Sequence, residues 1–207
     1  NIDRMAAAGM KFTQHYAGST VCAPTRCSLL NGVHTGHAFV RGNREVQPEG
    51  QAPIPADLIT IPKLLKEAGY TTGMFGKWGL GAPGSSGDPV NQGWDEFYGY
   101  NCQRQAHTFY PKHLWHNDKK VMLDGETYSH DLIHEHSLKF IRDNAESPFF
   151  AYLPITIPHA AMQCPEEDVA PFRKKFPQFE DLIGKYSHGT RVTNPVAAFA
   201  GMMTRMD

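Results

Sequence analysis

The sequence predicts an α/β fold in which a mixed, largely parallel sheet is flanked by helices. Helical and strand patterns alternate along the chain, which is typical of this class. Apolar residues make up 41% of the 207 residues, enough to bury the core of such a domain. The first and last residues both fall inside helical patterns, so we expect a domain that is truncated at both ends.

Start and stop signals define the first elements. Residues 1–8 have helical character that Gly9 ends, and residues 11–17 alternate like a strand. Pro24 suits the first positions of a helix and Gly32 suits its end, which predicts a short helix between them. A polar loop with several glycines and prolines follows.

The rest of the chain continues the alternation. Thr60 can cap a helix that Gly69 ends, because a threonine side chain can accept a bond from the first turn. The remaining expected elements are a strand over 70–78, a loop over 79–93, a helix of about four turns over 129–144, a continuous apolar and therefore buried strand over 148–155, and a helix from 194 to the end.

Charge and hydropathy argue against two classes of partner. Twenty Lys and Arg balance 21 Asp and Glu without a long run of either sign, so we expect no nucleic acid. The longest apolar run, residues 148–158, contains prolines and is shorter than the roughly 20 residues that span a bilayer, so we expect no membrane span. Four cysteines without a CxxC pair argue against a disulfide scaffold or a zinc ribbon.

Cys22 stands at the start of the helix predicted from Pro24. A helix N-terminus favours an anion through its unpaired N–H groups and its dipole. Arg26 lies four residues further on, on the same helix face, and offers a planar fork for an oxyanion. These residues predict an anion pocket that contains a nucleophile. A buried cysteine beside a structural arginine explains the local pattern equally well.

Histidines offer a second candidate site. His130 and His134 are four residues apart on a predicted helix, so both imidazoles could face one zinc ion. The motif lacks the glutamate of HExxH, which favours ordinary surface or core-edge histidines. The same ambiguity applies to the pairs His34/His37 and His113/His116 and to His136.

An extended motif around Cys22 resembles the signature of a known family. The segment CAPTR at 22–26, followed by LLNG at 29–32, is similar to the C-x-P-[ST]-R…L…G signature of the type I sulfatases, formylglycine-dependent and arylsulfatase-like members of the alkaline phosphatase superfamily. GYTTGMFGKWGLG at 69–81 resembles the second signature strand, and PFFAYLPITIPHAAMQCPEE at 148–167 a strand and histidine loop. The resemblance implies that residues 1–207 are part of a single sulfatase catalytic domain.

The resemblance also implies the chemistry. A maturing enzyme would convert Cys22 to formylglycine, and the hydrated aldehyde would carry two hydroxyls on one carbon. One hydroxyl attacks sulfur and displaces the alcohol, and the other expels sulfate by re-forming the carbonyl. A calcium ion, Ca²⁺, polarises the sulfate oxygens. The implied substrates are sulfate esters of carbohydrates or aryl alcohols.

Four further residues acquire expected roles from the resemblance. Arg26 matches the arginine that supports the formylglycine and metal site, and Lys77 the lysine that binds sulfate. His159 matches the histidine near the leaving oxygen and is a candidate general acid or sulfate ligand. Gly79 replaces a second histidine found in many members, and His107 is the candidate substitute for it.

Only the position of Cys22 among the expected calcium ligands lies within the sequence. The family's other ligands would precede Asn1 or follow Asp207, so we expect the chain to be catalytically incomplete alone. The resemblance implies a periplasmic, extracellular or lysosome-like location. Two alternatives stay open: a phosphonate or phosphate monoester hydrolase of the same superfamily, and a non-catalytic anion-binding member with unmodified Cys22.

Overall fold

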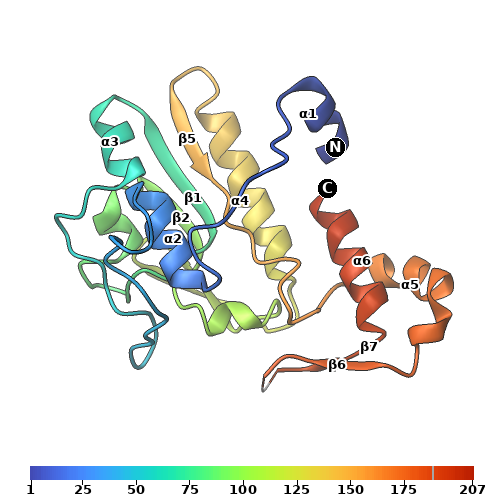
Figure 1. The fold of residues 1–207 in the computed structure, drawn as a ribbon. Coiled ribbons are helices and arrows are strands. Elements are labelled where there is room, and N and C mark those ends of the chain that lie inside the picture. Colours follow the sequence, from blue (N-terminus) through green and yellow to red (C-terminus); the bar gives the residue numbers. More distant parts are fainter. Residues whose placement is uncertain (188) are drawn as a thin grey trace. The chain divides into compact units, whose positions relative to one another are not determined.

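The computed structural model describes residues 1–187 and 189–207, which form two compact units (Figure 1). Gly18–Thr156 make up the larger unit, and Asn1–Ala17 with Ile157–Asp207 make up the smaller one. Cys22 and Lys77 belong to the larger unit and His159 belongs to the smaller.

The larger unit is built on a five-stranded mixed sheet. Its strand order is β4-β3-β2-β1-β5, in which β1 pairs in parallel with β2 and β5 while β3 and β4 extend the sheet as antiparallel strands. The elements are α2 (Cys22–Asn31), α3 (Ile61–Glu67), β1 (Thr71–Lys77), η1 (Pro89–Gln92), β2 (Glu96–Tyr100), η2 (Gln105–His107), β3 (His113–His116), β4 (Lys119–Met122), α4 (Ser129–Asp143) and β5 (Phe149–Tyr152).

The two faces of this sheet bury different helices. Successive residues of a strand point to opposite faces, and β1 shows this with two neighbouring side chains that are both fully buried. Met74 packs in a cluster with Leu30 of α2, and Phe75 packs in another with Phe140 of α4. Consequently α2 covers one side of β1 and α4 covers the other (Figure 1).

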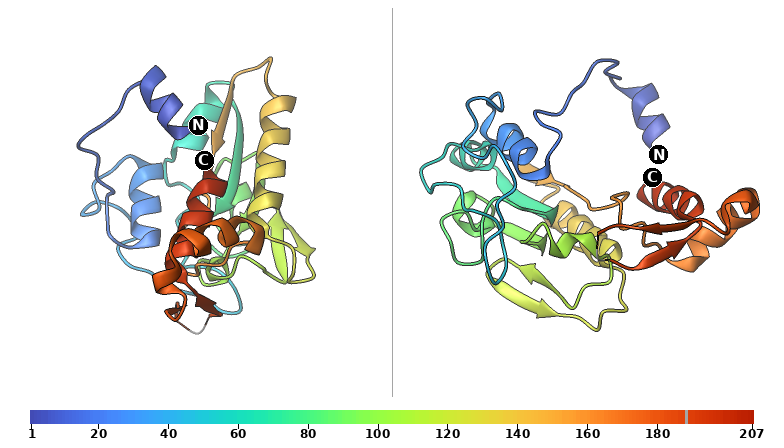
Figure 2. Two further views of the ribbon diagram at one scale, coloured as in Figure 1. Left: turned by 90° about the vertical axis from the view of Figure 1, so that its right-hand side faces the viewer. Right: turned by 60° about the horizontal axis from the view of Figure 1, so that its bottom comes forward.

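The smaller unit consists of helices and a short hairpin. Its elements are α1 (Ile2–Ala8), α5 (Glu166–Lys175), η3 (Pro177–Phe179), β6 (Ile183–Lys185), β7 (Arg191–Thr193) and α6 (Pro195–Met206). Strands β6 and β7 pair antiparallel, and α5 packs against α6 around Val169 and Ala197 (Figure 2).

Most of the predicted elements are confirmed. Gly32 ends α2 with φ 68°, and its N–H donates to the carbonyl of Ser28. The helix begins at Cys22 itself, two residues before Pro24. Thr60 precedes α3, but its hydroxyl donates to the carbonyl of Gln92 rather than capping the helix.

Two predicted strands need correction. No strand forms over residues 11–17, where Phe12 and Tyr16 are 69% and 81% exposed. Alternation alone does not make a strand, because the backbone needs a paired neighbour and the apolar side chains need a surface to cover. The strand predicted over 148–155 is shorter, Phe149–Tyr152, and only half-buried, because it pairs on one side with β1 at the edge of the sheet.

Candidate active site

The candidate site forms where β1 ends and α2 begins. Cys22 is the first residue of α2 and Lys77 is the last residue of β1. The Nζ atom of Lys77 donates to Sγ of Cys22 across 3.5 Å. Ligands of parallel α/β sheets commonly bind outside the carboxyl ends of the strands, and this pair lies at such an end. The fold therefore brings together two of the residues expected in the site.

Arg26 holds this arrangement from the next turn of α2. Its Nη1 atom donates to the main-chain carbonyl of Lys77, which ties the helix to the end of the strand. Its Nε atom is buried and has no hydrogen-bond partner. Burial lowers the pKa of Arg26, while Tyr152 and Cys22 oppose that shift. Because guanidinium groups stay protonated in proteins, Arg26 keeps a positive charge beside Cys22.

Lys77 adds a second positive charge to the pocket. The side chain is only 3% exposed. Burial lowers the pKa of Lys77, the charge of Arg26 lowers it further, and Cys22 acts in the opposite direction. An ammonium group that is short of water and close to another cation is stabilised by any anion that enters. The surroundings of Cys22 thus suit an oxyanion such as sulfate.

Side chains rather than free backbone amides create this preference. Of the amides in the first turn of α2, that of Ala23 donates to Oδ1 of Asn43 across 3.1 Å. The amide of Thr25 donates to the carbonyl of Val21 across 3.1 Å, and Pro24 has no N–H. The expectation that unpaired helix amides hold the anion is therefore wrong for these residues. Asn43 instead caps the helix from a distant loop.

Gln103 fills the space beside Gly79, where the family often has histidine. Gly79 has φ +82°, and a Cβ atom built on it would lie 2.5 Å from Cγ of Gln103. Gln103 is 3% exposed, and its Nε2 atom donates to Oδ1 of Asn43 across 3.1 Å. His107, the substitute expected from the sequence, lies four residues further on in η2 and is partly buried. Its role stays a prediction.

Asn43 and Gln103 are therefore site residues that the sequence did not reveal. The only signal was the glycine at position 79, from which we expect the contact of the missing histidine to be either absent or supplied by another side chain. Nothing in the local pattern identifies Gln103, because it reaches Gly79 through the pairing of β1 with β2. Together the two amides connect the end of β2 to the first turn of α2.

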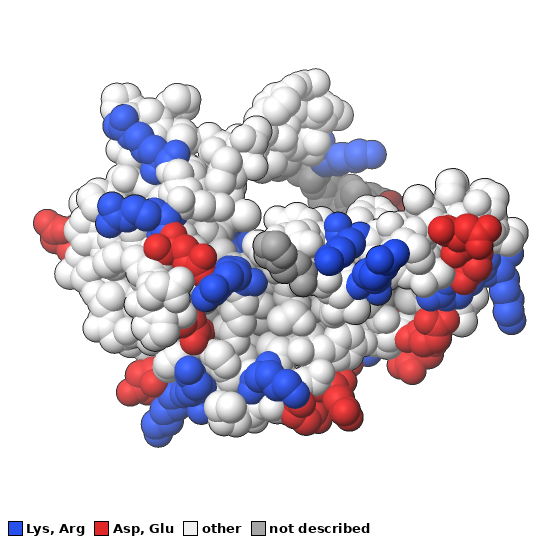
Figure 3. All heavy atoms as spheres, turned by 90° about the horizontal axis from the view of Figure 1, so that it is seen from below, with Lys and Arg blue, Asp and Glu red and all other residues white. Residues whose placement is uncertain are grey.

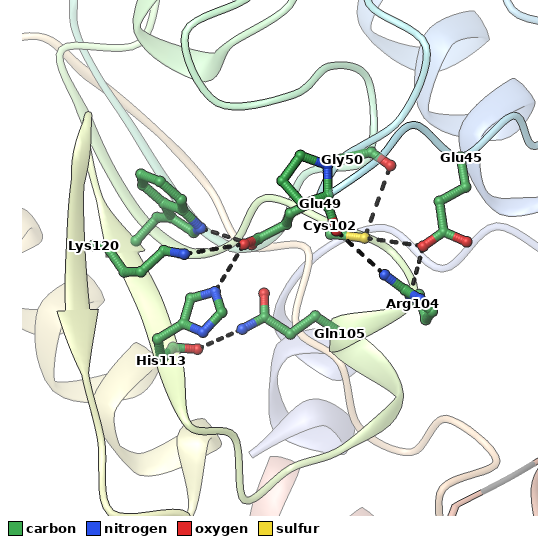
Figure 4. A network of polar contacts seen from close by, with 10 residues as sticks. Glu45, Glu49, Gly50, Cys102, Arg104, Gln105, His113 and Lys120 are labelled. Carbon is green, nitrogen blue, oxygen red and sulfur yellow. Dashed lines mark hydrogen bonds and ion pairs between the residues drawn. The ribbon is translucent and has the colours of Figure 1, made fainter.

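The loop that carries Asn43 is anchored by Glu49 (Figure 4). Its carboxylate accepts a hydrogen bond of 2.7 Å from Nε1 of Trp115, lies 2.9 Å from Nε2 of His113, and pairs with Lys120 at 3.5 Å. All three partners belong to β3 or β4, so the sheet holds the loop in place. These contacts restrict the backbone of the loop from which Asn43 caps α2.

A hollow of about 510 Å³ opens beside Asn43. Its lining includes the basic residues Arg41 and Arg44, and polar and apolar groups are mixed in it. The lining residues are Phe39, Val40, Arg41, Gly42, Asn43, Arg44, Ala52 and Pro53. Because Asn43 also touches the first turn of α2, the hollow is a candidate binding site for the leaving group of a substrate.

His159 lies in the smaller unit, in the loop before α5. Its ring packs edge-on against Tyr186, with ring centroids 5.1 Å apart and planes at 88°. The expected role of His159 as a general acid or sulfate ligand stays a prediction. For the histidine pair that suggested zinc, the structure adds no third ligand: among the described residues, no cluster of three possible ligands includes His130 or His134.

The described neighbours of Cys22 are basic side chains. In the described part of the chain, no group of three or more His, Cys, Asp or Glu ligand atoms includes Cys22. Its near neighbours Lys77 and Arg26 are cations, whereas calcium takes six to eight oxygen ligands. Cys22 could contribute a single ligand after modification, and the other ligands would have to come from elsewhere.

The described part of the chain has a surface of mixed charge. Basic and acidic side chains are interspersed over the face shown in Figure 3, consistent with a net charge of -1. Within the described residues, no helix combines the length and the apolar character that crossing a membrane requires.

Known proteins resemble the chain over its whole length. The family model described as Sulfatase matches residues 1–207. An arylsulfatase of Hemicentrotus pulcherrimus is 34% identical over 78% of this chain and 33% of its own. N-acetylgalactosamine-6-sulfatase of Rattus norvegicus is 33% identical over 77% of this chain and 34% of its own. The chain thus spans about a third of the length of these curated relatives.

Solved structures share the fold. The crystal structure of Ps i-CgsB in complex with k-i-k-neocarrahexaose matches with a TM-score of 0.77 and 26% identity, over 98% of this chain and 46% of that one. A structure determined with its substrate, D-glucosamine-2-N,6-O-disulfate, matches with a TM-score of 0.66 and 25% identity, over 84% of this chain and 32% of that one. With a family model that covers every residue and solved structures that share the fold, the chain belongs to the sulfatase family.

Proposed function

We propose that the protein carrying this chain is a sulfuric ester hydrolase that uses a formylglycine made from Cys22. The observation that carries the proposal is the pair of cations around position 22, of which Lys77 is buried and Arg26 is partly buried. Lys77 lies 3.5 Å from Sγ, and Arg26 braces the lysine backbone and keeps one N–H unpaired. Membership of the sulfatase family supports the same reaction.

The residues of this chain fit a modified side chain at position 22. A hydrated aldehyde there would supply the attacking hydroxyl and the means to expel sulfate. Lys77 would bind a sulfate oxygen and stabilise the negative charge that grows as the ester bond breaks. Arg26 would hold the end of β1 next to α2 through the carbonyl of Lys77. Asn43 would fix the first turn of the helix through the amide of Ala23.

His159 and His107 complete the proposed machinery. We assign to His159 the protonation of the leaving oxygen or a contact to sulfate, and to His107 a contact to the substrate, in line with the family pattern. Gln103 is a positioning residue in this scheme, since its amide nitrogen is committed to Asn43. Calcium takes six to eight oxygen ligands, and among the described residues no group of three carboxylate, imidazole or thiol ligands includes Cys22, so we propose that this chain alone releases no sulfate.

The substrate class rests on the basic hollow and on the relatives. Arg41 and Arg44 line the hollow beside Asn43, where they could pair with further negative groups of a sulfated sugar. One structural neighbour was solved with a disulfated glucosamine substrate, and one relative is an N-acetylgalactosamine-6-sulfatase. We therefore propose a sulfated carbohydrate as the natural substrate, with aryl sulfates as simple surrogates.

A location follows from the same proposal. Many relatives of this kind are exported, and we place the protein in a periplasmic, extracellular or lysosome-like compartment, where a maturing enzyme has already modified Cys22. Two other functions compete with sulfate hydrolysis. A phosphonate or phosphate monoester hydrolase would use the same pocket on phosphorus, and a non-catalytic member would keep Cys22 as a thiol and only bind an anion.

Matched kinetics on the natural full-length protein distinguish these functions. The protein is produced with a maturing enzyme and assayed on 4-nitrophenyl sulfate, 4-nitrophenyl phosphate and a 4-nitrophenyl phosphonate, which share one leaving group. We expect the highest kcat/KM on the sulfate, and no turnover by the Cys22→Ala variant. A preference for either phosphorus ester would replace the proposal with the first alternative, and turnover that survives in Cys22→Ala would refute both.

A further inference from the structure

A cluster of three potential metal ligands lies on the opposite side of the sheet from Cys22. Glu96 comes from β2, His116 from β3 and His136 from α4, and one ligand atom of each lies within 4.8 Å of the others. Oε1 of Glu96 is 3.8 Å from Nε2 of His116 and 3.9 Å from Nδ1 of His136. These separations are too long for hydrogen bonds. The two imidazoles therefore surround the carboxylate without bonding to it.

The spacing is close to what a shared ion requires. Zinc binds imidazole nitrogen and carboxylate oxygen at about 2.0–2.2 Å, and in a tetrahedron such ligands stand roughly 3.4 Å apart. The two measured separations exceed that value by about half an ångström, which small side-chain rotations can close. An ion at the centre would replace three unbonded neighbours with three direct bonds.

The ring of Tyr98 packs against both histidines of the cluster. Tyr98 follows Glu96 by two residues, so both side chains point to the same face of β2. The Tyr98 ring stacks on His136 with centroids 3.6 Å apart at 9°, and meets the ring of His116 at 5.8 Å and 73°. Tyr98 itself is 3% exposed. Both imidazoles consequently rest on a buried ring, which restricts their rotamers before any ion arrives.

Charge and access also suit a cation. Among the described residues, the basic side chains within 4 Å of the Glu96 carboxylate are those of His116 and His136. The charge of Lys139 also acts on Glu96, but its ammonium pairs with Asp143, one turn further along α4. The three ligand side chains are partly exposed, so an ion can enter and water can complete its coordination.

This cluster is separate from the site proposed for catalysis. In the parallel pairing of β1 with β2, Glu96 lies opposite Gly73, whereas Lys77 lies opposite Tyr100. The four residue steps from Gly73 to Lys77 correspond to about 13 Å along the strand. Glu96 also faces α4, whereas Cys22 lies on the α2 side. An ion held by Glu96 would therefore be independent of the reaction at Cys22.

We propose that Glu96, His116 and His136 bind a zinc ion, with water as the fourth ligand. Imidazole nitrogen is a preferred donor for zinc and a poor one for calcium or magnesium, which select oxygen. The ligands come from two strands and a helix, so the ion joins α4 to the outer part of the sheet. Zinc that binds only the folded protein would also stabilise it.

Metal titration of the natural full-length protein tests the site. The protein is stripped with EDTA and titrated with Zn²⁺ by calorimetry and with Co²⁺ by visible absorption, which reports tetrahedral coordination. We expect one equivalent of zinc to bind at this site, with a higher melting temperature. Glu96→Gln, His116→Ala and His136→Ala should each weaken that equivalent by more than about 100-fold, because removing even an outer-shell partner costs up to that much.

Matched controls make the result decisive. His134→Ala removes an exposed histidine from the same helix and should leave zinc affinity unchanged. Glu96→Gln keeps the shape of the side chain, so its metal-free melting temperature should stay near that of the natural protein. If the zinc equivalent persists in all three ligand variants, or if none binds to the natural protein, the proposal is wrong.

Discussion

Lys77→Met is the substitution that probes the proposed anion pocket most directly. The Lys77 ammonium lies 3.5 Å from Sγ of Cys22 and is 3% exposed, so methionine can replace its length while removing its charge. Unit charges at that separation and an effective dielectric of about 20 interact by roughly 4–5 kcal/mol. If that interaction serves the transition state, its loss corresponds to about a 10³-fold decrease in kcat/KM.

The assay is steady-state hydrolysis of 4-nitrophenyl sulfate by the matured full-length protein. Because Lys77 could also affect maturation, the mass of the peptide containing residue 22 is measured in each preparation, and rates are normalised to the converted fraction. Lys174→Met serves as a control, since Lys174 is an exposed residue on α5. A Lys77→Met enzyme that is fully converted and retains kcat/KM within about tenfold of the natural protein would refute the assignment of Lys77.

Three further predictions concern the same neighbourhood. Asn43→Ala removes the cap on the amide of Ala23 and should lower the free energy of unfolding by about 1 kcal/mol, measured by urea denaturation, with an unchanged value speaking against the cap. Gly79→Ala should lower the free energy of unfolding by at least about 1 kcal/mol, because the residue has a positive φ and an added Cβ would meet Gln103. Adding Gln103→Ala should recover part of that loss, and strictly additive effects of the two substitutions would contradict the contact. Burial and the charge of Arg26 lower the pKa of Lys77, so the alkaline limb of the kcat/KM profile should fall at a pH below the ordinary lysine value of 10.5. Lys77→Arg should move this alkaline limb to higher pH if activity is retained. An alkaline limb that does not move would exclude Lys77 as its source.

Local sequence signals predicted the elements that frame the site. Cys22 at a helix start, Gly32 at its end and Lys77 at the end of a buried strand all follow from capping residues and hydrophobic patterning. The same reasoning failed for residues 11–17, because an alternating pattern carries no information about whether a partner strand exists. It also did not identify the helix α5 or the strands β2, β3, β4, β6 and β7. These strands are three to five residues long and depend on tertiary pairing.

Within the site, the sequence anticipated the charged residues but not the amides that position them. The family resemblance indicated that the motif around Cys22 and Lys77 of β1 belong to one site. Asn43 and Gln103 meet across 60 residues, and their bond depends on how the loop after α2 lies over the sheet. The zinc cluster shows the same limit: helical spacing suggested His130 with His134, whereas the fold brings His136 to residues of two strands.

The chemical identity of residue 22 is the most direct test of the central claim. Tryptic digestion of the natural full-length protein, isolated from its own source, releases the peptide of residues 12–26, whose mass depends on that side chain. The proposed function predicts a peptide lighter than the cysteine form by about 18 Da, and sulfate release in proportion to the converted fraction. A preparation that carries only unmodified Cys22 and yet hydrolyses sulfate esters as fast as a converted preparation would contradict the proposed function.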